Sequence, residues 1–158
     1  MSTSTTETNG RLAADLFHRH PLACAWALYF ACSAIAACLV QFIVVPLLLP
    51  QLHAGHGLLA GYDAVAYHAI ATALAAEVGS NGWSAWTLAP AGQPAAGLAA
   101  AFYAIVVPEP WALIPVNAGL HATAGTLIAL FLRDLDVDAD IALIGGALFV
   151  CFPSSLQW

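Results

Sequence analysis

Apolar residues along this chain gather in long runs separated by short polar stretches. The longest run covers residues 23–49, where only Ser33 and Gln41 are clearly polar. Two further runs cover residues 111–132 and 141–158. About 20 apolar residues cross a bilayer as an α-helix, so each run is read as a transmembrane helix, and the first can cross with tilt. The pattern predicts an all-α membrane protein with about three transmembrane helices.

The segment between the first two runs, residues 50–110, is expected to form a large loop that carries surface helices. Residues 63–78 are rich in alanine, lack glycine and proline, and precede 79-GSNG-82, which favours a helix end. The larger apolar residues at helical spacing are Tyr67, Ile70 and Leu74. They predict one buried stripe on a helix that lies on the membrane surface.

A second apolar stretch in this loop, residues 95–107, is too short to span a bilayer. It is expected to form an interfacial or re-entrant helix. Trp83 and Trp86 lie among turn residues before it. Tryptophan favours the headgroup zone of a membrane, and the alternative role of both side chains is to form a wall for a lipid-linked or sugar ligand.

Composition supports the membrane interpretation. Charged residues make up 8% of the chain, whereas a soluble domain carries about 25%. The net charge of −6 comes with no basic patch, so nucleic-acid binding has no support. The cysteines are Cys24, Cys32, Cys38 and Cys151. All four fall within predicted spans without metal-ligand spacing, and they are interpreted as small apolar residues.

The basic residues predict the orientation. They are Arg11, Arg19 and Arg133. The positive-inside rule places all of them in the cytoplasm if the tail 1–22 and the turn 133–140 are cytoplasmic. The loop 50–110 then lies on the periplasmic or extracellular side. The string 35-IAAC-38 resembles a lipoprotein cleavage box, but the apolar run continues beyond it, so an uncleaved helix is expected.

The acidic string 134-DLDVDAD-140 contains overlapping DxD patterns. Such a pattern holds a divalent metal against a diphosphate in soluble nucleotide-sugar transferases. Here it lies in a short connection between two spans, and Ala139 occupies the glycine position of an EF-hand loop. A solvated acidic turn is therefore the preferred interpretation.

The outer loop contains three ionisable candidates for chemistry. Asp63 opens the first surface helix, where it serves either as an N-cap or as a catalytic carboxylate. Glu109 precedes the second span, where a negative charge near a helix N-terminus is favourable in its own right. His68 shares a helix face with Thr72, four residues later.

Polar residues also occur inside the second predicted span. Asn117 and His121 are four residues apart and share one face, which Gly125 continues. Intramembrane polar groups usually face the bundle interior. Hydrogen bonding between helices is favoured over direct substrate contact, so both are interpreted as structural. At the end of the third span, Pro153 is expected to break the helix and Trp158 to lie in the headgroup belt.

The order of these features resembles a known superfamily. The strings concerned are 61-GYDAVAYHAIA-71, 93-QPAAGLAAAFYAI-105, 117-NAGLHATAGTLIALFLRDL-135 and 152-FPSSLQW-158. Together they resemble the N-terminal part of the C-class membrane glycosyltransferases, which use polyprenyl-phosphate-linked sugars. Protein O-mannosyltransferases and the aminoarabinose transferases of lipid A are relatives of this kind. Such enzymes have many more spans, so the chain is expected to be the front part of a longer protein.

The resemblance implies roles for individual residues. Asp63 matches the acidic residue that acts as general base toward the acceptor or helps to position a divalent metal ion. His68, Glu109, Trp83 and Trp86 become weaker candidates for substrate binding. The implied partners are membrane lipid, a polyprenyl-phosphate-linked sugar donor and an unidentified acceptor, at a bacterial inner (plasma) membrane with the N-terminus in the cytoplasm.

One departure from the expected chemistry is the absence of Lys and Arg from the loop 50–110. A phosphate leaving group needs cationic or metal stabilisation, so either His53, His56 and His68 supply charge or the groups lie elsewhere. The alternative function is a non-catalytic small membrane subunit or a transporter fragment. A transporter is expected to show hydrophobic repeats, and the sequence contains no such repeat.

Overall fold

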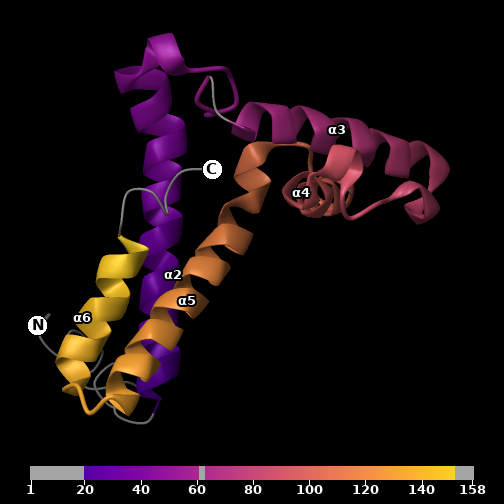
Figure 1. Ribbon diagram of the computed structural model, residues 1–158. Coiled ribbons are helices and arrows are strands. Elements are labelled where there is room, and N and C mark those ends of the chain that lie inside the picture. Colours follow the sequence, from indigo (N-terminus) through magenta and orange to yellow (C-terminus); the bar gives the residue numbers. More distant parts are fainter. Residues whose placement is uncertain (1–19, 61–62, 152–158) are drawn as a thin grey trace, which may run out of the picture. The chain divides into compact units, whose positions relative to one another are not determined.

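The protein is helical in the parts that the structure describes. The structure is a computed structural model, and it describes residues 20–60 and 63–151. The longer helices are α2 (Pro21–Leu39), the π-helix η1 (Val40–Leu48), α3 (Asp63–Asn81), α4 (Pro94–Ile105), α5 (Ile114–Asp134) and α6 (Ala139–Val150) (Figure 1). Short 3-10 turns are η2 (Pro50–Leu52), η3 (Trp83–Ala85), η4 (Pro90–Gly92) and η5 (Pro110–Leu113). Apart from one isolated bridge between His53 and Leu59, these residues contain no β-structure, which confirms the all-α prediction.

Among the described residues, two helices are long and apolar enough to cross a membrane, Pro21–Leu48 and Pro110–Asp134. They correspond to the predicted spans 23–49 and 111–132. The third predicted span, 141–158, is only partly described, because α6 ends at Val150. A 12-residue helix measures about 18 Å, less than a bilayer requires, so the third span stays a prediction. Pro153, Trp158 and the predicted tail up to residue 19 lie outside the described residues.

The first long helix changes its winding before it ends. Pro46 lies inside η1 and cannot donate a backbone hydrogen bond. The amide of Leu49 bonds to the carbonyl of Val44 at 3.1 Å, a five-residue step typical of a π-turn. The chain leaves the helix at Leu49, and Pro50 opens the turn that follows.

The described residues fall into two compact units, and the first contains residues 20–33 and 118–151. Its core joins α2, α5 and α6 through Ala25, Tyr29, Ala122 and Val150. A side chain on Gly146 would meet the backbone oxygen of Gly125, so α5 and α6 approach backbone to backbone. Small residues of this kind allow close helix packing in membranes.

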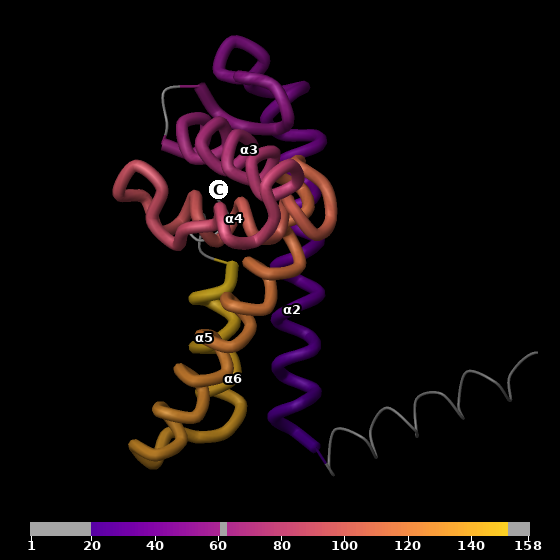
Figure 2. The backbone as a smooth tube through the Cα atoms, turned by 90° about the vertical axis from the view of Figure 1, so that its right-hand side faces the viewer, coloured from indigo at the N-terminus to yellow at the C-terminus, as the bar shows by residue number. Residues whose placement is uncertain are grey.

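The second unit contains residues 34–60 and 63–117, and its core lies between α3 and α4. Figures 1 and 2 show α3 lying across α4. The core residues are Ala71, Leu74, Ala75, Ala99, Ala100, Tyr103 and Leu113. Because most of them are alanine, the two helix backbones approach closely, and few large side chains are needed to fill the space between them.

Two details of the α3 prediction are corrected. The buried residues of α3 are Ala71, Leu74, Ala75 and Val78. Of the predicted stripe, Leu74 is buried, whereas Tyr67 and Ile70 are only partly buried. Tyr67 lies on the same side of the helix as Leu74 but two turns nearer its start, and Ile70 lies at the edge of that side. The helix also runs past residue 78 to Asn81, and the break comes at Gly82, which has φ 79°. A residue at positive φ ends a helix, and glycine adopts that conformation without strain.

Candidate functional site

A tight turn after η2 places one histidine in a defined position. Gly55, His56 and Gly57 have φ values of 95°, 52° and 75°, three consecutive residues in the left-handed region. The carbonyl of His56 accepts a hydrogen bond from Nε2 of Gln41 at 2.9 Å. A side chain on Gly57 would collide with Gln41. Gln41 therefore holds the strained backbone of His56 in place, through the hydrogen bond to its carbonyl and the close approach to Gly57. Backbone strain at a residue other than glycine often marks a functional position.

His53 stabilises this turn through its ring. Its Nε2 accepts a hydrogen bond from the backbone N–H of Gly57 at 3.1 Å. An accepting nitrogen cannot carry a proton, so this contact requires the neutral imidazole. His53 is therefore a structural residue of the turn.

His56 pairs with Glu109, which lies just before η5. Its Nδ1 is 2.8 Å from Oε2 of Glu109, and the side chains are 51% and 33% exposed. A carboxylate only accepts hydrogen bonds, so Nδ1 carries the proton and donates it. A pair this exposed contributes about 0–1 kcal/mol to stability. The pair matters more for the orientation of the ring. Because Nδ1 donates to Glu109, Nε2 is the ring nitrogen of His56 that carries no proton in the neutral form.

A second pair lies beside the first. Nδ1 of His68 on α3 is 3.0 Å from the hydroxyl of Tyr103 on α4, and the His56 and His68 ring centroids are 5.2 Å apart. Burial, assisted by the charge of Glu109, raises the pKa of Tyr103 to about 12, so the phenol keeps its proton, and the tautomer of His68 decides which of the two groups donates. We name His56, His68, Tyr103 and Glu109 the loop cluster.

The loop cluster restricts where a positive charge can form. Burial first, and then the neighbouring His56, lower the pKa of His68, while Glu109 acts in the opposite direction. His56 has a direct carboxylate partner in Glu109, whereas His68 contacts the neutral hydroxyl of Tyr103.

Asp63 is the first residue of α3, and its side chain is exposed. No hydrogen bond or ion pair joins its carboxylate to another described residue, and neither a capping contact nor a link to the loop cluster is seen there. The helix N-terminus next to it favours a negative charge. Farther along α3, the hydroxyl of Thr72 is buried and has no hydrogen-bond partner among the described residues.

The two tryptophans of the loop differ in their surroundings. Trp86 packs against the α3–α4 core, and its indole N–H donates to the carbonyl of Gly97 at 3.0 Å. Trp83 lies in η3 and is 54% exposed. Trp86 thus braces the connection between the helices, and Trp83 is the one whose side chain faces outward.

The two polar residues of the predicted second span, His121 and Asn117, belong to different units. In the first unit, Nδ1 of His121 on α5 is 3.3 Å from Oγ of Ser33 on α2, and Ser33 is buried. This contact joins α5 to α2, and the structural role of His121 stays a prediction. Asn117 belongs to the second unit, where it is partly buried. No side-chain partner of Asn117 occurs among the residues described.

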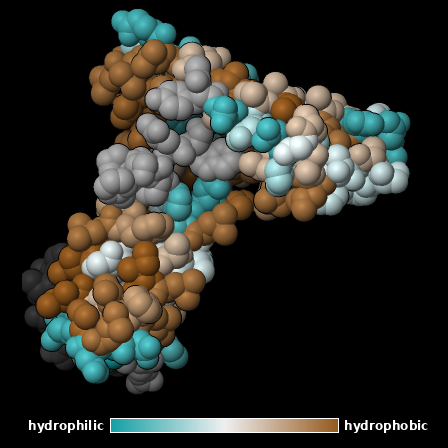
Figure 3. Space-filling view, viewed as in Figure 1, coloured by the Kyte–Doolittle hydropathy of each residue, from teal (hydrophilic) through white to brown (hydrophobic). Residues whose placement is uncertain are grey.

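The acidic string forms a turn that is shorter than the predicted 133–140, because α5 continues to Asp134 and α6 begins at Ala139. All four of its aspartates are exposed. Asp138 caps α6 by accepting a hydrogen bond from the N–H of Asp140 at 3.1 Å. In Figure 3 polar colour gathers at this end of α5 and α6, as expected for a solvated turn.

The described residues do not fit a divalent-metal site. In residues 20–60 and 63–151 no three His, Cys, Asp or Glu side chains are placed to hold a metal ion. Asp63 would act as a metal ligand only together with groups from elsewhere.

Sequence reasoning singled out His68 and Glu109 separately. The structure brings them together through His56, and it adds Tyr103, whose place in an apolar run gave no signal of a polar role. Comparisons with protein-family models, with curated proteins and with solved structures give no match to this chain. The resemblance to the C-class glycosyltransferases therefore rests on the residue strings alone.

Proposed function

We propose that this chain is the N-terminal membrane module of a glycosyltransferase that moves a sugar from a polyprenyl-phosphate carrier to an acceptor. The observation that carries the proposal is the exposed carboxylate of Asp63, which has no partner among the described residues. It stands at the start of a helix in a folded loop between two membrane-length helices.

In the proposed reaction Asp63 is the general base. The acceptor hydroxyl oxygen bonds to the anomeric carbon of the sugar while the bond from that carbon to the phosphate oxygen breaks. Asp63 takes the hydroxyl proton, and the polyprenyl phosphate leaves with the electron pair of the broken bond. The proton then passes to water, which restores the carboxylate. General-base catalysis of this kind contributes about 10²–10⁴-fold to a rate.

Among the loop histidines, His56 is the proposed source of positive charge near the leaving phosphate. The loop has no Lys or Arg. His53 is committed to accepting the Gly57 N–H, and burial lowers the pKa of His68. Because the described residues do not form a metal site, no step is assigned to a metal.

The proposed orientation follows from α5. Its N-terminal end joins the loop, and Arg133 lies exposed in its last turn. The positive-inside rule then places the loop on the outer side of a bacterial inner membrane and the N-terminus in the cytoplasm. Membrane lipid and the polyprenyl-phosphate-linked donor are the proposed partners, together with a hydroxyl-bearing acceptor.

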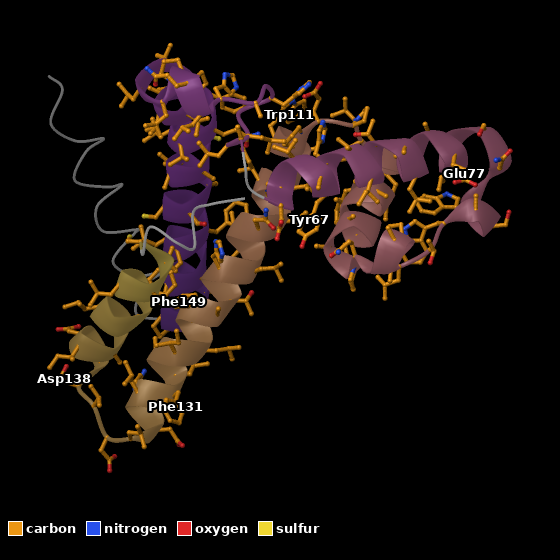
Figure 4. All side chains as sticks on the ribbon, turned by 45° about the horizontal axis from the view of Figure 1, so that its top comes forward. Tyr67, Glu77, Trp111, Phe131, Asp138 and Phe149 are labelled. Atoms are coloured by element: carbon orange, nitrogen blue, oxygen red, sulfur yellow. The ribbon has the colours of Figure 1, made fainter. Side chains whose placement is uncertain are left out.

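The test is Asp63→Asn in the natural protein at its full length, assayed for sugar transfer in membranes. Transfer should fall by about 10²-fold or more, with membrane insertion unchanged. Glu77→Gln is the matched control, because Glu77 is an exposed carboxylate near the opposite end of α3 from Tyr67 (Figure 4). Wild-type transfer by Asp63→Asn would refute the role of the carboxylate and favour the non-catalytic alternative, whereas equal losses in both variants would indicate a general defect of α3.

A further inference from the structure

The two helices of the loop expose different kinds of surface. Leu98 and Ile105 on α4 are 55% and 70% exposed, and Val106, which follows the helix, is 60% exposed. Throughout α3 no large apolar side chain is exposed, and its exposed positions are alanine, glycine and polar residues. Figure 3 shows polar colour at the end of the loop unit that includes the end of α3.

The exposed residues of α4 form a face opposite to its buried face. The buried residues of α4 are Ala96, Gly97, Ala99, Ala100 and Tyr103. Leu98 and Ile105 are seven residues apart, so they lie on one side of the helix, close to half a turn from the buried Ala96 and Ala100. The α4 helix is therefore apolar on both sides, and only the inner side is covered by α3.

Chain connectivity determines what can cover the outer side. Residues 106–109 alone separate the end of α4 from Pro110, where the second membrane-length helix begins. Fully extended, this link reaches at most about 18 Å. The C-terminal end of α4 therefore stays close to the membrane boundary. Trp111, 44% exposed at the start of that helix, is of the residue type that favours this boundary.

We propose that the outer face of α4, defined by Leu98, Ile105 and Val106, is a lipid-contact surface that inserts at the boundary between headgroups and acyl chains. The α3 helix then lies on α4, away from the lipid, and keeps Asp63 in the aqueous layer. The contact is apolar rather than electrostatic, since residues 50–110 contain no Lys or Arg to attract anionic lipids. It would hold whether or not the protein transfers sugar.

The test uses nitroxide labels on the full chain reconstituted in phosphatidylcholine nanodiscs, with the native cysteines replaced by alanine. Labels are placed at Leu98→Cys and Ile105→Cys on α4 and, as the matched control, at Ala73→Cys on the exposed side of α3. Collisions with oxygen, which dissolves in lipid, are compared with collisions with a water-soluble nickel chelate. The α4 labels should favour oxygen several-fold more than the Ala73→Cys label, with no change when anionic lipid replaces part of the neutral lipid.

Three outcomes would overturn the proposal. Preference for the nickel chelate at both α4 positions would show that this face is in water. Protection of the α4 labels from both reagents would show that protein, such as a second copy of the chain, covers it. Oxygen preference at Ala73→Cys as strong as at Leu98→Cys would show that α3 lies in the lipid as well.

Discussion

Replacing Gly57 by alanine is expected to open the turn that holds His56. Gly57 has φ 75°, and an L-residue in the left-handed region costs about 1–2 kcal/mol. The new methyl carbon would also lie 2.6 Å from the backbone oxygen of Gln41, which cannot rotate away as a side chain could. Forcing an extra carbon into a packed site costs about 1–3 kcal/mol. The two effects together destabilise the turn by about 2–5 kcal/mol.

Gly55→Ala separates the two effects. Gly55 has φ 95°, but a side chain there would meet nothing within 4 Å, so only the backbone strain applies. The assay is amide hydrogen exchange over residues 52–60, where the N–H of Leu58 bonds to the carbonyl of Gly55 at 2.9 Å. Exchange in Gly57→Ala should exceed that in Gly55→Ala by the collision alone, about 5–150-fold for 1–3 kcal/mol. Equal exchange in the two variants would refute the packing of Gln41 against this turn.

Two further predictions concern helix packing and pH. Gly146→Ala should destabilise the first unit by about 1–3 kcal/mol, because the added carbon meets the backbone of Gly125. In the control Gly119→Ala the added carbon meets nothing within 4 Å, so that variant should be neutral or more stable by up to about 1 kcal/mol. Thermal unfolding of both variants in detergent measures this difference, and equal melting points would contradict it. The pKa of His68 is lower in the folded state than in the unfolded state. As the pH falls, the unfolded chain therefore binds a proton at this position before the folded chain does. The stability that His68 contributes above about pH 6.5 is lost as the pH falls toward the folded-state pKa. Amide exchange in α3, corrected for intrinsic rates, should therefore rise below pH 6.5 in the wild type and rise less in His68→Gln, while the same slope in both would remove His68 as the cause.

The sequence predicts the long helices because their signal is local. Runs of apolar residues such as 23–49 need no knowledge of their neighbours to be recognised, and the structure has membrane-length helices there and at 111–132. The depth of burial along a helix is different, since it depends on where the neighbouring helix packs. For α3 the predicted stripe contains the buried Leu74, but Tyr67 and Ile70 in the same stripe are only partly buried.

The loop cluster was beyond sequence reasoning for a similar reason. His56 and Glu109 are 53 residues apart, and His68 and Tyr103 are 35 apart, so only the folded loop brings them together. The available signal was the glycines on both sides of His56, because consecutive left-handed residues require such a neighbourhood. That signal identifies a turn, but it does not identify the partner of the histidine.

The loop separates the residues that give it stability from those that are proposed to give it function. Its core is the contact between small residues in the middle of α3 and α4, such as Ala71 and Ala100. Asp63 lies at the start of α3, outside that core, and His56 lies in a turn held by its own hydrogen bonds. Changes at Asp63 can therefore remove a charge without disturbing the core, whereas an enlarged side chain at Ala100 would move both helices. Because of this separation, the loss of transfer expected for Asp63→Asn can be interpreted as chemistry rather than unfolding.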